Sequence, residues 1–289
     1  MTLYRLHHST TYDYSEPVVI GTHFMHLLPR ERPGQNVREA HLDVLPAPEN
    51  RRDEVDHFGN RTTAVSLAGA HKQFNVNLSA TIDVCLPAPP PAAESPRWEA
   101  IAAWGQQELD VAEFCLPSRL AMPAGEIADY AAVSFLPGRK ILEALLELNR
   151  RIFMEMTYKS GVTNNFTTAL QILHTRAGVC QDYAHFMLSC LRALGLPGRY
   201  VSGYLRTLPP PGQTARRGAD QSHAWVSCWA GPDIGWVDFD PTNNLLVSDE
   251  HVTLAWGRDF SDISPLRGII LGGGRHALHV GVDLEPVLT

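Results

Sequence analysis

Apolar and polar residues alternate in short runs over the first 86 residues, and turn-forming residues separate the runs. Such alternation is typical of strands that bury one face. The clearest runs predict strands at residues 10–14, 41–45, 62–67 and 74–84. Their number and spacing predict a small β-sandwich domain at the start of the chain.

A proline cluster ends this pattern. Residues 87–96 contain five prolines, which exclude a helix and remove backbone hydrogen-bond donors. We therefore predict a β-rich domain at 1–86, a linker at 87–96 and a second domain at 97–289. Beyond the linker the apolar period becomes helical, most plainly at Ile141, Leu145, Leu148 and Ile152, and strands return near residue 199. The second domain is thus predicted to be α+β.

Two helices are predicted around Cys180. Thr168 followed by Gln171 is a capping-box pattern that opens a short helix, and Gly178 is expected to end it. A second helix begins at Cys180 and stops near Gly195. At a helix N-terminus the free backbone N–H groups and the helix dipole favour a thiolate, and the same N–H groups can bind an oxyanion.

A cysteine is more often a small buried apolar residue than a nucleophile, and this alternative applies to Cys180 as well. Asp182, in the first turn of the same helix, is interpreted as a partner of the helix dipole. The other cysteines lie in apolar, strand or mid-helix contexts and are interpreted as packing residues: Cys85, Cys115, Cys190 and Cys228.

Downstream, residues 222–229 and 235–240 alternate as two strands around a short turn at 230–233. A four-residue hairpin loop places Trp225 opposite Asp238 and His223 opposite Asp240. A carboxylate opposite a histidine is close enough to orient the imidazole, although such a pair can also serve sheet stability alone. A register slip of one residue would turn the carboxylates to the other face.

Composition narrows the function classes. The chain has 289 residues, 44% of them hydrophobic and 19% charged, and a formal net charge of −7. These values are typical of a globular protein and argue against nucleic acid as a partner. The absence of a long apolar run and of an N-terminal signal pattern predicts no membrane insertion and a cytoplasmic location. The five scattered cysteines indicate neither a disulfide scaffold nor a zinc site.

Three motifs carry a resemblance to a known family. Gly178-Val179-Cys180-Gln181-Asp182, Ser222-His223-Ala224-Trp225 and Asp238-Phe239-Asp240-Pro241-Thr242 resemble the core motifs of the bacterial transglutaminase-like cysteine peptidase family, and residues 1–84 resemble its β-rich N-terminal region. The resemblance implies a papain-like fold, in which a nucleophile helix packs on an antiparallel sheet.

By position, the resemblance makes Cys180 the nucleophile, His223 the base and Asp240 the orienting carboxylate. Tyr158 resembles an aromatic residue that assists the oxyanion, with core packing as its alternative role. Trp225, on the same strand face as His223, is a second candidate for oxyanion or substrate binding. Asp238 stands where family members often have a small residue, and it is a minor rival to Asp240.

These residues predict thiol-dependent acyl transfer on a peptide or carboxamide through a thioester. The resemblance to the bacterial branch of the family implies hydrolysis. Transfer of a glutamine acyl group to an amine and a non-catalytic peptide-binding module are the alternatives. The partner would be a peptide or protein, and neither a cofactor nor a metal is predicted, because His276 and His279 fall on opposite strand faces. The segment Thr207–Asp220 is hypothesised to border the substrate cleft. The sequence does not indicate an oligomeric state.

Overall fold

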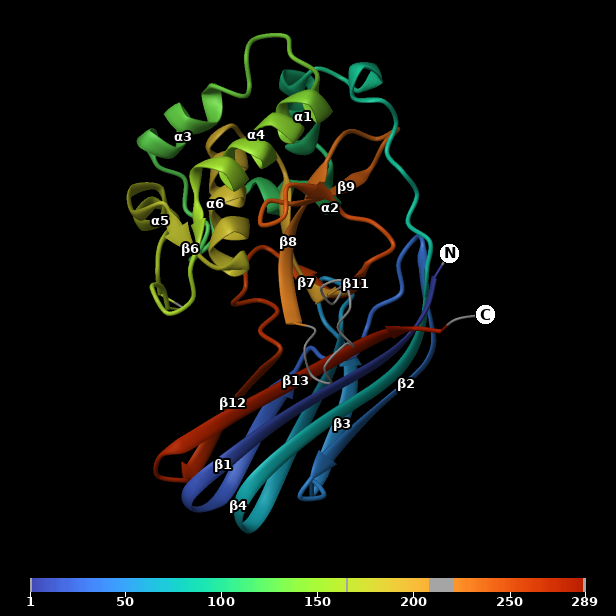
Figure 1. The fold of residues 1–289 in the computed structure, drawn as a ribbon, viewed down its shortest axis with the longest axis vertical. Helices are drawn as coiled ribbons and strands as arrows, with labels where there is room; N and C mark the ends of the chain where they lie inside the picture. Colours follow the sequence, from blue (N-terminus) through green and yellow to red (C-terminus); the bar gives the residue numbers. More distant parts are fainter. Residues whose placement is uncertain (1, 165, 208–220, 288–289) are drawn as a thin grey trace, which may run out of the picture.

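The computed structural model describes residues 2–164, 166–207 and 221–287, and it shows a core of helices and strands above a long, bent sheet (Figure 1). The strands of the bent sheet share antiparallel pairing and are β1 (Thr2–Met25), β2 (Gln35–Leu45), β3 (Asn50–Val55), β4 (Arg61–Val84), β12 (Leu266–Gly272) and β13 (His276–Pro286). We call this part the sheet module. The β-rich character of the N-terminal region is therefore confirmed.

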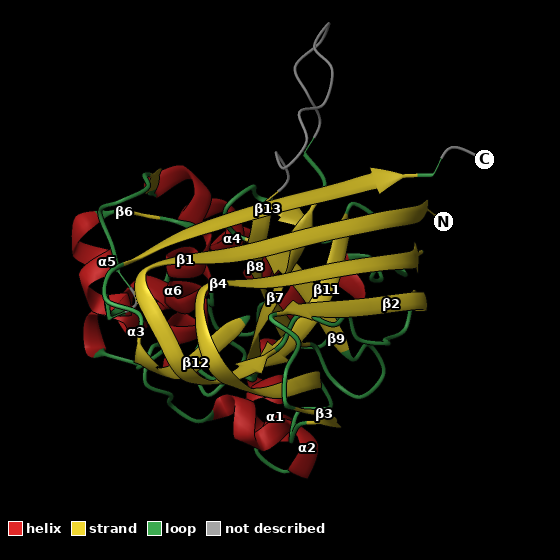
Figure 2. Cartoon of the chain, turned by 90° about the horizontal axis from the view of Figure 1, so that it is seen from below, coloured by secondary structure: helices red, strands yellow, loops and turns green. Residues whose placement is uncertain are grey.

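The β-sandwich predicted from the sequence would consist of two separate sheets. The strands of the sheet module instead form one hydrogen-bonded sheet. Its order is β12-β1-β4-β2, with β13 on the first half of β1 and β3 on the first half of β4. The pairing of β1 with β4 is interrupted between Asp13 and Val18, where β1 turns (Figure 2). Irregular pairing of this kind bends a strand, so each long strand serves both halves of the module.

The sequence-based division assigned all of residues 97–289 to the second domain. In the structure, the last two strands of the chain pair with the first strand. β13 pairs with residues Tyr4–Tyr14 of β1, and β12 pairs with residues Val18–Met25 of the same strand. The chain thus leaves the sheet module at the linker and returns to it at residue 266. An alternating strand pattern shows which side chains are buried but does not show which sheet the strand joins.

The remaining elements form the core module. Its helices are α1 (Trp98–Gly105), α2 (Leu109–Ala112), α3 (Gly125–Ala132), α4 (Ile141–Glu155), α5 (Ala169–Thr175) and α6 (Cys180–Ala193). Its strands are β5 (Thr157–Tyr158), β6 (Ala177–Gly178), β7 (Gly198–Leu205), β8 (Gln221–Trp229), β9 (Trp236–Asp240), β10 (Leu245–Leu246) and β11 (His251–Gly257). The main sheet has the order β10-β9-β8-β7-β11, and β5 pairs separately with β6.

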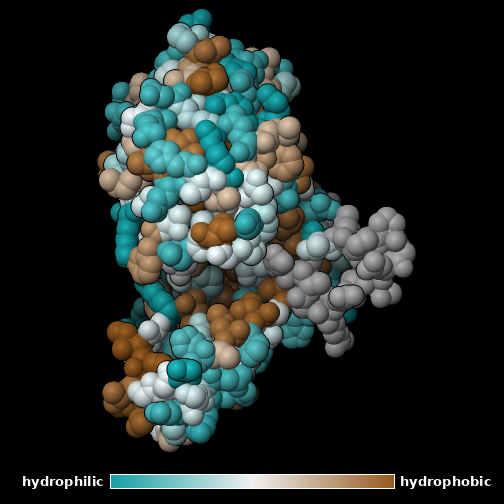
Figure 3. All heavy atoms as spheres, turned by 60° about the vertical axis from the view of Figure 1, so that its left-hand side comes forward, coloured by the Kyte–Doolittle hydropathy of each residue, from teal (hydrophilic) through white to brown (hydrophobic). Residues whose placement is uncertain are grey.

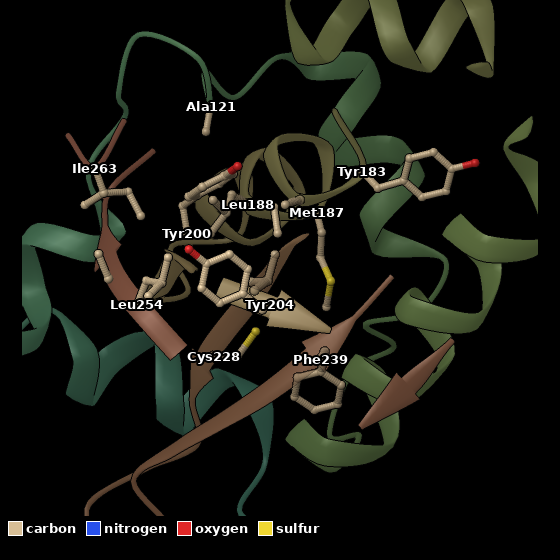
Figure 4. Packing of buried hydrophobic residues seen from close by; sticks show 14 of the residues in the cluster. Ala121, Tyr183, Met187, Leu188, Tyr200, Tyr204, Cys228, Phe239, Leu254 and Ile263 are labelled. Atoms are coloured by element: carbon tan, nitrogen blue, oxygen red, sulfur yellow. The ribbon is translucent and has the colours of Figure 1, made fainter. Parts of the chain in front are cut away.

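Helix α6 packs on this sheet through its apolar face. Met187 and Leu188 of α6 face Cys228 of β8 and Phe239 of β9 (Figure 4), and all four side chains are buried. Gly195 follows the helix with a φ of 69°, as expected for a glycine that ends a helix. The packing of a helix on an antiparallel sheet, predicted from the resemblance, is confirmed.

Side-chain amides of the sheet module bind the edge strand β11. The Gln35 amide donates to the carbonyl of Thr253 at 2.8 Å and accepts from its N–H at 2.8 Å. Asn60 makes the same pair of bonds with Trp256, at 2.8 and 2.9 Å. An edge strand has backbone groups that need partners when buried. These two buried amides provide them, and they fix the sheet module against the core module.

The sheet module also carries exposed apolar side chains (Figure 3), which include Ile20, Ile269 and Leu271. Ile20 lies opposite Leu271 in the β1–β12 pairing, so these residues form a continuous patch on β1 and β12. In the described residues, no helix combines the length and apolar character that crossing a membrane requires.

Gly203 on β7 is a position where the packing requires glycine. A Cβ there would collide with the carbonyl oxygen of Val252 and with the indole of Trp225. We expect Gly203→Ala to lower the free energy of unfolding by roughly 1–3 kcal/mol, since overpacking shifts neighbouring groups. Urea denaturation measures this change. Gly125→Ala is the matched control, because its Cβ meets nothing within 4 Å. Equal loss in both variants would contradict the argument.

Candidate active site

Cys180 is the first residue of α6 and is therefore at the helix N-terminus, as predicted. The chain reaches it from β6, which follows α5; Thr168 and Gln171 form the predicted capping box of α5. That helix ends at Arg176, which adopts a left-handed conformation with φ 51°, so the predicted break at Gly178 lies two residues too late. Gly178 instead belongs to β6.

Asp182 fixes the first turn of α6. Its carboxylate accepts the backbone N–H of Val179 at 2.8 Å and the hydroxyl of Thr163 at 2.7 Å. Burial raises the pKa of Asp182 above its usual range, while these hydrogen bonds act against the rise. A Cβ at Gly178 would lie 2.7 Å from the Asp182 carboxylate. Glycine before the helix therefore lets this carboxylate close over the turn that presents Cys180.

The five cysteines differ in environment. Cys180 is half-buried, Cys190 and Cys228 are fully buried, Cys115 is partly buried and Cys85 is exposed. Burial raises the pKa of the Cys115 thiol to about 11, and it also raises the pKa values of Cys190 and Cys228 well above the usual range. The interpretation as packing residues fits Cys190 and Cys228, but Cys85 lies on the surface just after β4 and does not pack. Cys180 is thus a thiol at a helix N-terminus that solvent can reach.

The β8–β9 hairpin brings His223 and Asp240 together, although its register differs from the predicted one. Trp229 pairs with Trp236, and Ser227 pairs with Asp238, so each residue of β8 is shifted by two relative to the prediction. A shift of two residues keeps every side chain on its predicted face. His223 and Asp240 therefore meet diagonally, with Nε2 and Oδ2 2.8 Å apart.

The Asp240 carboxylate is completely buried and is surrounded by donors. Oδ1 accepts the backbone N–H groups of Thr242 at 2.9 Å and Asn243 at 3.2 Å. Oδ2 accepts from the Asn243 amide at 2.7 Å and faces Nε2 of both His223 and His251, at 2.8 and 3.5 Å. Burial alone would raise the pKa of Asp240, but these hydrogen bonds and the His223 charge hold it well below its usual range. Asp240 is therefore ionised.

His223 links this carboxylate to the thiol. Its Nε2 hydrogen bonds with Asp240, and Cys180 lies close enough to the ring to raise its pKa. Because Nε2 bonds with Asp240, Nδ1 is the ring nitrogen left for Cys180. Burial acts to lower the pKa of His223, but the hydrogen bonds and charges of Asp240 and Cys180 outweigh it and raise the pKa above the usual 6.5. This raised pKa favours a protonated His223 ring at neutral pH.

The other predicted site residues have different environments. Tyr158 is 51% exposed. Burial, together with the nearby Cys180 and Asp182, raises its pKa, so the phenol keeps its proton. Trp225 is fully buried, and its indole N–H faces Asp238 at 3.4 Å. This burial does not fit the predicted contact with substrate. Asp238 binds Arg32 at 2.6 Å, so Asp240 is the carboxylate at the histidine.

Sequence reasoning missed His251 and Asn243. Asn243 lies in a turn three residues after Asp240, and a local turn pattern could have indicated its bond. His251 comes from β11 and is fully buried; it had no local signal.

Within the described residues, His223, Asp240 and His251 converge closely enough to be considered as metal ligands. The Asn243 amide, however, donates into the same space, and no metal is needed to satisfy the carboxylate. The predicted cleft segment falls almost entirely at 208–220, outside the described residues.

Two family models match this chain. Residues 4–83 match the bacterial transglutaminase-like N-terminal region, and residues 132–241 match the transglutaminase-like superfamily model. An uncharacterized protein of Mycobacterium tuberculosis is 37% identical over 290 residues, which cover 98% of this chain and 92% of the relative. A relative from Mycobacterium leprae is 30% identical over 97% of both chains.

The chain belongs to the transglutaminase-like superfamily and carries the bacterial N-terminal region that accompanies its core. A protein-glutamine gamma-glutamyltransferase of Pseudomonas aeruginosa is 42% identical over 120 residues, which are 41% of this chain and 18% of that protein. A solved structure from Cytophaga hutchinsonii, described as a candidate cysteine protease, superposes with a TM-score of 0.77 at 22% identity and covers 100% of this chain and 91% of its own. That likeness supports the fold. Members of the superfamily are usually enzymes.

Replacing Asp240 tests the electrostatics of the site. Asp240→Asn removes the negative charge that stabilises the imidazolium, so the pKa of His223 should fall from its raised value and the ring should lose its proton at lower pH. NMR titration of the His223 imidazole, assigned with a His223→Gln variant, measures the midpoint. Asp53→Asn, on the exposed strand β3, is the control and should leave it unchanged. An unmoved midpoint in Asp240→Asn would refute this account.

Proposed function

We propose that this protein is a cysteine peptidase or amidase that hydrolyses a peptide or carboxamide bond through a thioester. The observation that carries the proposal is the connected series Cys180, His223 and Asp240, in which a half-buried thiol meets an imidazole that an ionised, buried carboxylate holds. Each group has the environment that its role in acyl transfer requires.

In the first half-reaction, Cys180 Sγ attacks the carbonyl carbon of the substrate and its proton resides on His223 Nδ1. The C–N bond then breaks, and the imidazolium gives this proton to the leaving amine. The oxyanion of the intermediate needs donors. The N–H groups of Asp182 and Tyr183 bond to the Val179 carbonyl at 2.9 and 3.1 Å, which leaves the N–H groups of Cys180 and Gln181 for the oxyanion. The Tyr158 hydroxyl is proposed as a further donor.

In the second half-reaction, His223 takes a proton from water as the water oxygen attacks the thioester carbon. The C–S bond breaks, the carboxylic acid leaves and the thiol is restored. Throughout both steps Asp240 keeps its charge and holds the imidazole in one orientation. Water is favoured as the acceptor because Cys180 is only half-buried and Tyr158 beside it is exposed.

Transfer to an amine is the second candidate. The stretch that is 42% identical to a Pseudomonas aeruginosa protein-glutamine gamma-glutamyltransferase favours it. The two reactions share the first half-reaction and differ only in which molecule attacks the thioester. A non-catalytic peptide-binding module, the third alternative from the sequence, would not require the buried Asp240 and its five donors.

We expect the purified protein to cleave a peptide or glutamine carboxamide, and Cys180→Ser to lower kcat/KM by on the order of 10³ or more, because the thiol forms the covalent intermediate. Cys85→Ser, a change at an exposed thiol, should leave the rate unchanged. Mass spectrometry of a glutamine-rich protein mixed with a dansylated amine distinguishes the acceptors. New peptide ends or deamidation support hydrolysis, whereas covalently bound amine would contradict it in favour of transfer.

A further inference from the structure

His251 is a buried histidine that contacts the candidate active site but has no role in the proposed reaction. It is fully buried, and its Nε2 lies 3.5 Å from Asp240 Oδ2. Its ring meets Trp225 edge to face at 5.3 Å between centroids and lies 6.3 Å from the His223 ring. Within the described residues, Asp240 and His223 are thus titratable groups that face it.

The hydrogen bonds of His251 define which of its nitrogens carries the proton. The backbone N–H of Ser248 donates to Nδ1 at 3.4 Å, so Nδ1 must be an acceptor in this arrangement. The proton of a neutral imidazole is then on Nε2 and points toward Asp240. Such a donor restrains the carboxylate without adding a positive charge that would compete with the His223 imidazolium.

The backbone around His251 is held on both sides. The chain crosses from β10, at one edge of the main sheet, to β11 at the other edge. In this crossing, Asp249 accepts the backbone N–H of Leu86 at 2.7 Å, and the Glu250 carbonyl accepts that of Arg206 at 3.0 Å. The N–H of His251 itself bonds to the Ser248 carbonyl at 3.0 Å. The ring is thus presented by an anchored segment of backbone.

We propose that His251 is a positioning residue of the active site, which holds Asp240 Oδ2 in the place where it accepts the Nε2 proton of His223. Oδ2 meets donors from β8, from the turn after β9 and from β11, and together they fix its position. Without the donor from β11, the carboxylate can rotate toward Asn243, and the His223 ring loses its fixed orientation toward Cys180. This role rests on the proposed function.

The test compares His251→Leu with His251→Gln. Leucine removes the donor, whereas the glutamine amide can present an N–H near the place of Nε2. We expect His251→Leu to lower kcat by roughly 10- to 100-fold with little change in KM, as for other residues that orient a reacting group, and His251→Gln to recover most of that loss.

His26 offers a matched control. It is also a buried histidine that contacts a carboxylate, Asp56 at 3.2 Å, but it lies in the sheet module. His26→Leu and His251→Leu should lower the melting temperature alike, while only His251→Leu lowers kcat. Equal kcat in the two leucine variants, or no recovery with glutamine, would overturn the positioning role.

Two measurements separate failure of this inference from failure of the proposed function. Iodoacetamide at about pH 6 should label wild-type Cys180 before Cys85, because thiolates react selectively there. Absence of this preference counts against the proposed function.

The downfield NMR signal of the His223 Nε2 proton reports its bond to Asp240 without any substrate. Its broadening in His251→Leu and return in His251→Gln support positioning, and an unchanged signal contradicts it. Inhibition by Zn²⁺ that depends on His251 would identify a metal site instead.

Discussion

The burial of one carboxylate organises the candidate active site. An ionised carboxylate without solvent contact is stable only when hydrogen-bond donors surround it, and Asp240 has no exposed surface. Its donors come from strand β8, from the turn that follows β9 and from strand β11. Because these segments must meet at one group, the pairing of the sheet and the orientation of His223 are determined together.

The sheet module contributes to this arrangement although it holds none of the candidate catalytic residues. β11 is an edge strand, and its buried backbone groups at Thr253 and Trp256 bond to Gln35 and Asn60. A buried hydrogen bond between His8 and Tyr204, 2.6 Å long, joins β1 to β7. Tyr204 pairs with Ser222, the residue before His223. The position of β8, the strand that carries His223, thus depends on contacts with residues far earlier in the chain.

Local features of the sequence predicted the parts of the site that local physics determines. The capping box of α5 and the apolar pattern that begins at Cys180 placed this residue at a helix N-terminus, although α5 ends at Arg176 and not at the predicted Gly178. The alternation of β8 and β9 placed His223 and Asp240 on one face. This prediction is correct although the predicted register was wrong, because a shift of two residues preserves the face. The hairpin loop proved longer than the turn residues alone suggested.

Features that depend on distant contacts could not be predicted in this way. Nothing near His251 in the sequence shows that the chain crosses the sheet to bring it to Asp240. The burial of Trp225 depends on Gly203 of the neighbouring strand. The pairing of β12 and β13 with the first sheet depends on the edge of β1 that does not pair with β4. In each case the residue that determines the contact lies too far away in the sequence for the local hydrophobic pattern to indicate it.

The packing around Trp225 connects these distant contacts to the chemistry. Its indole fits against Gly203, and its N–H faces Asp238, which also binds Arg32 of the sheet module. Asp238 and Asp240 lie on the same face of β9, so the first carboxylate holds the strand to the sheet module while the second holds the histidine. A change at Arg32 would leave Asp238 buried beside Trp225 without its cation. That unpaired charge would destabilise β9, the strand that carries Asp240.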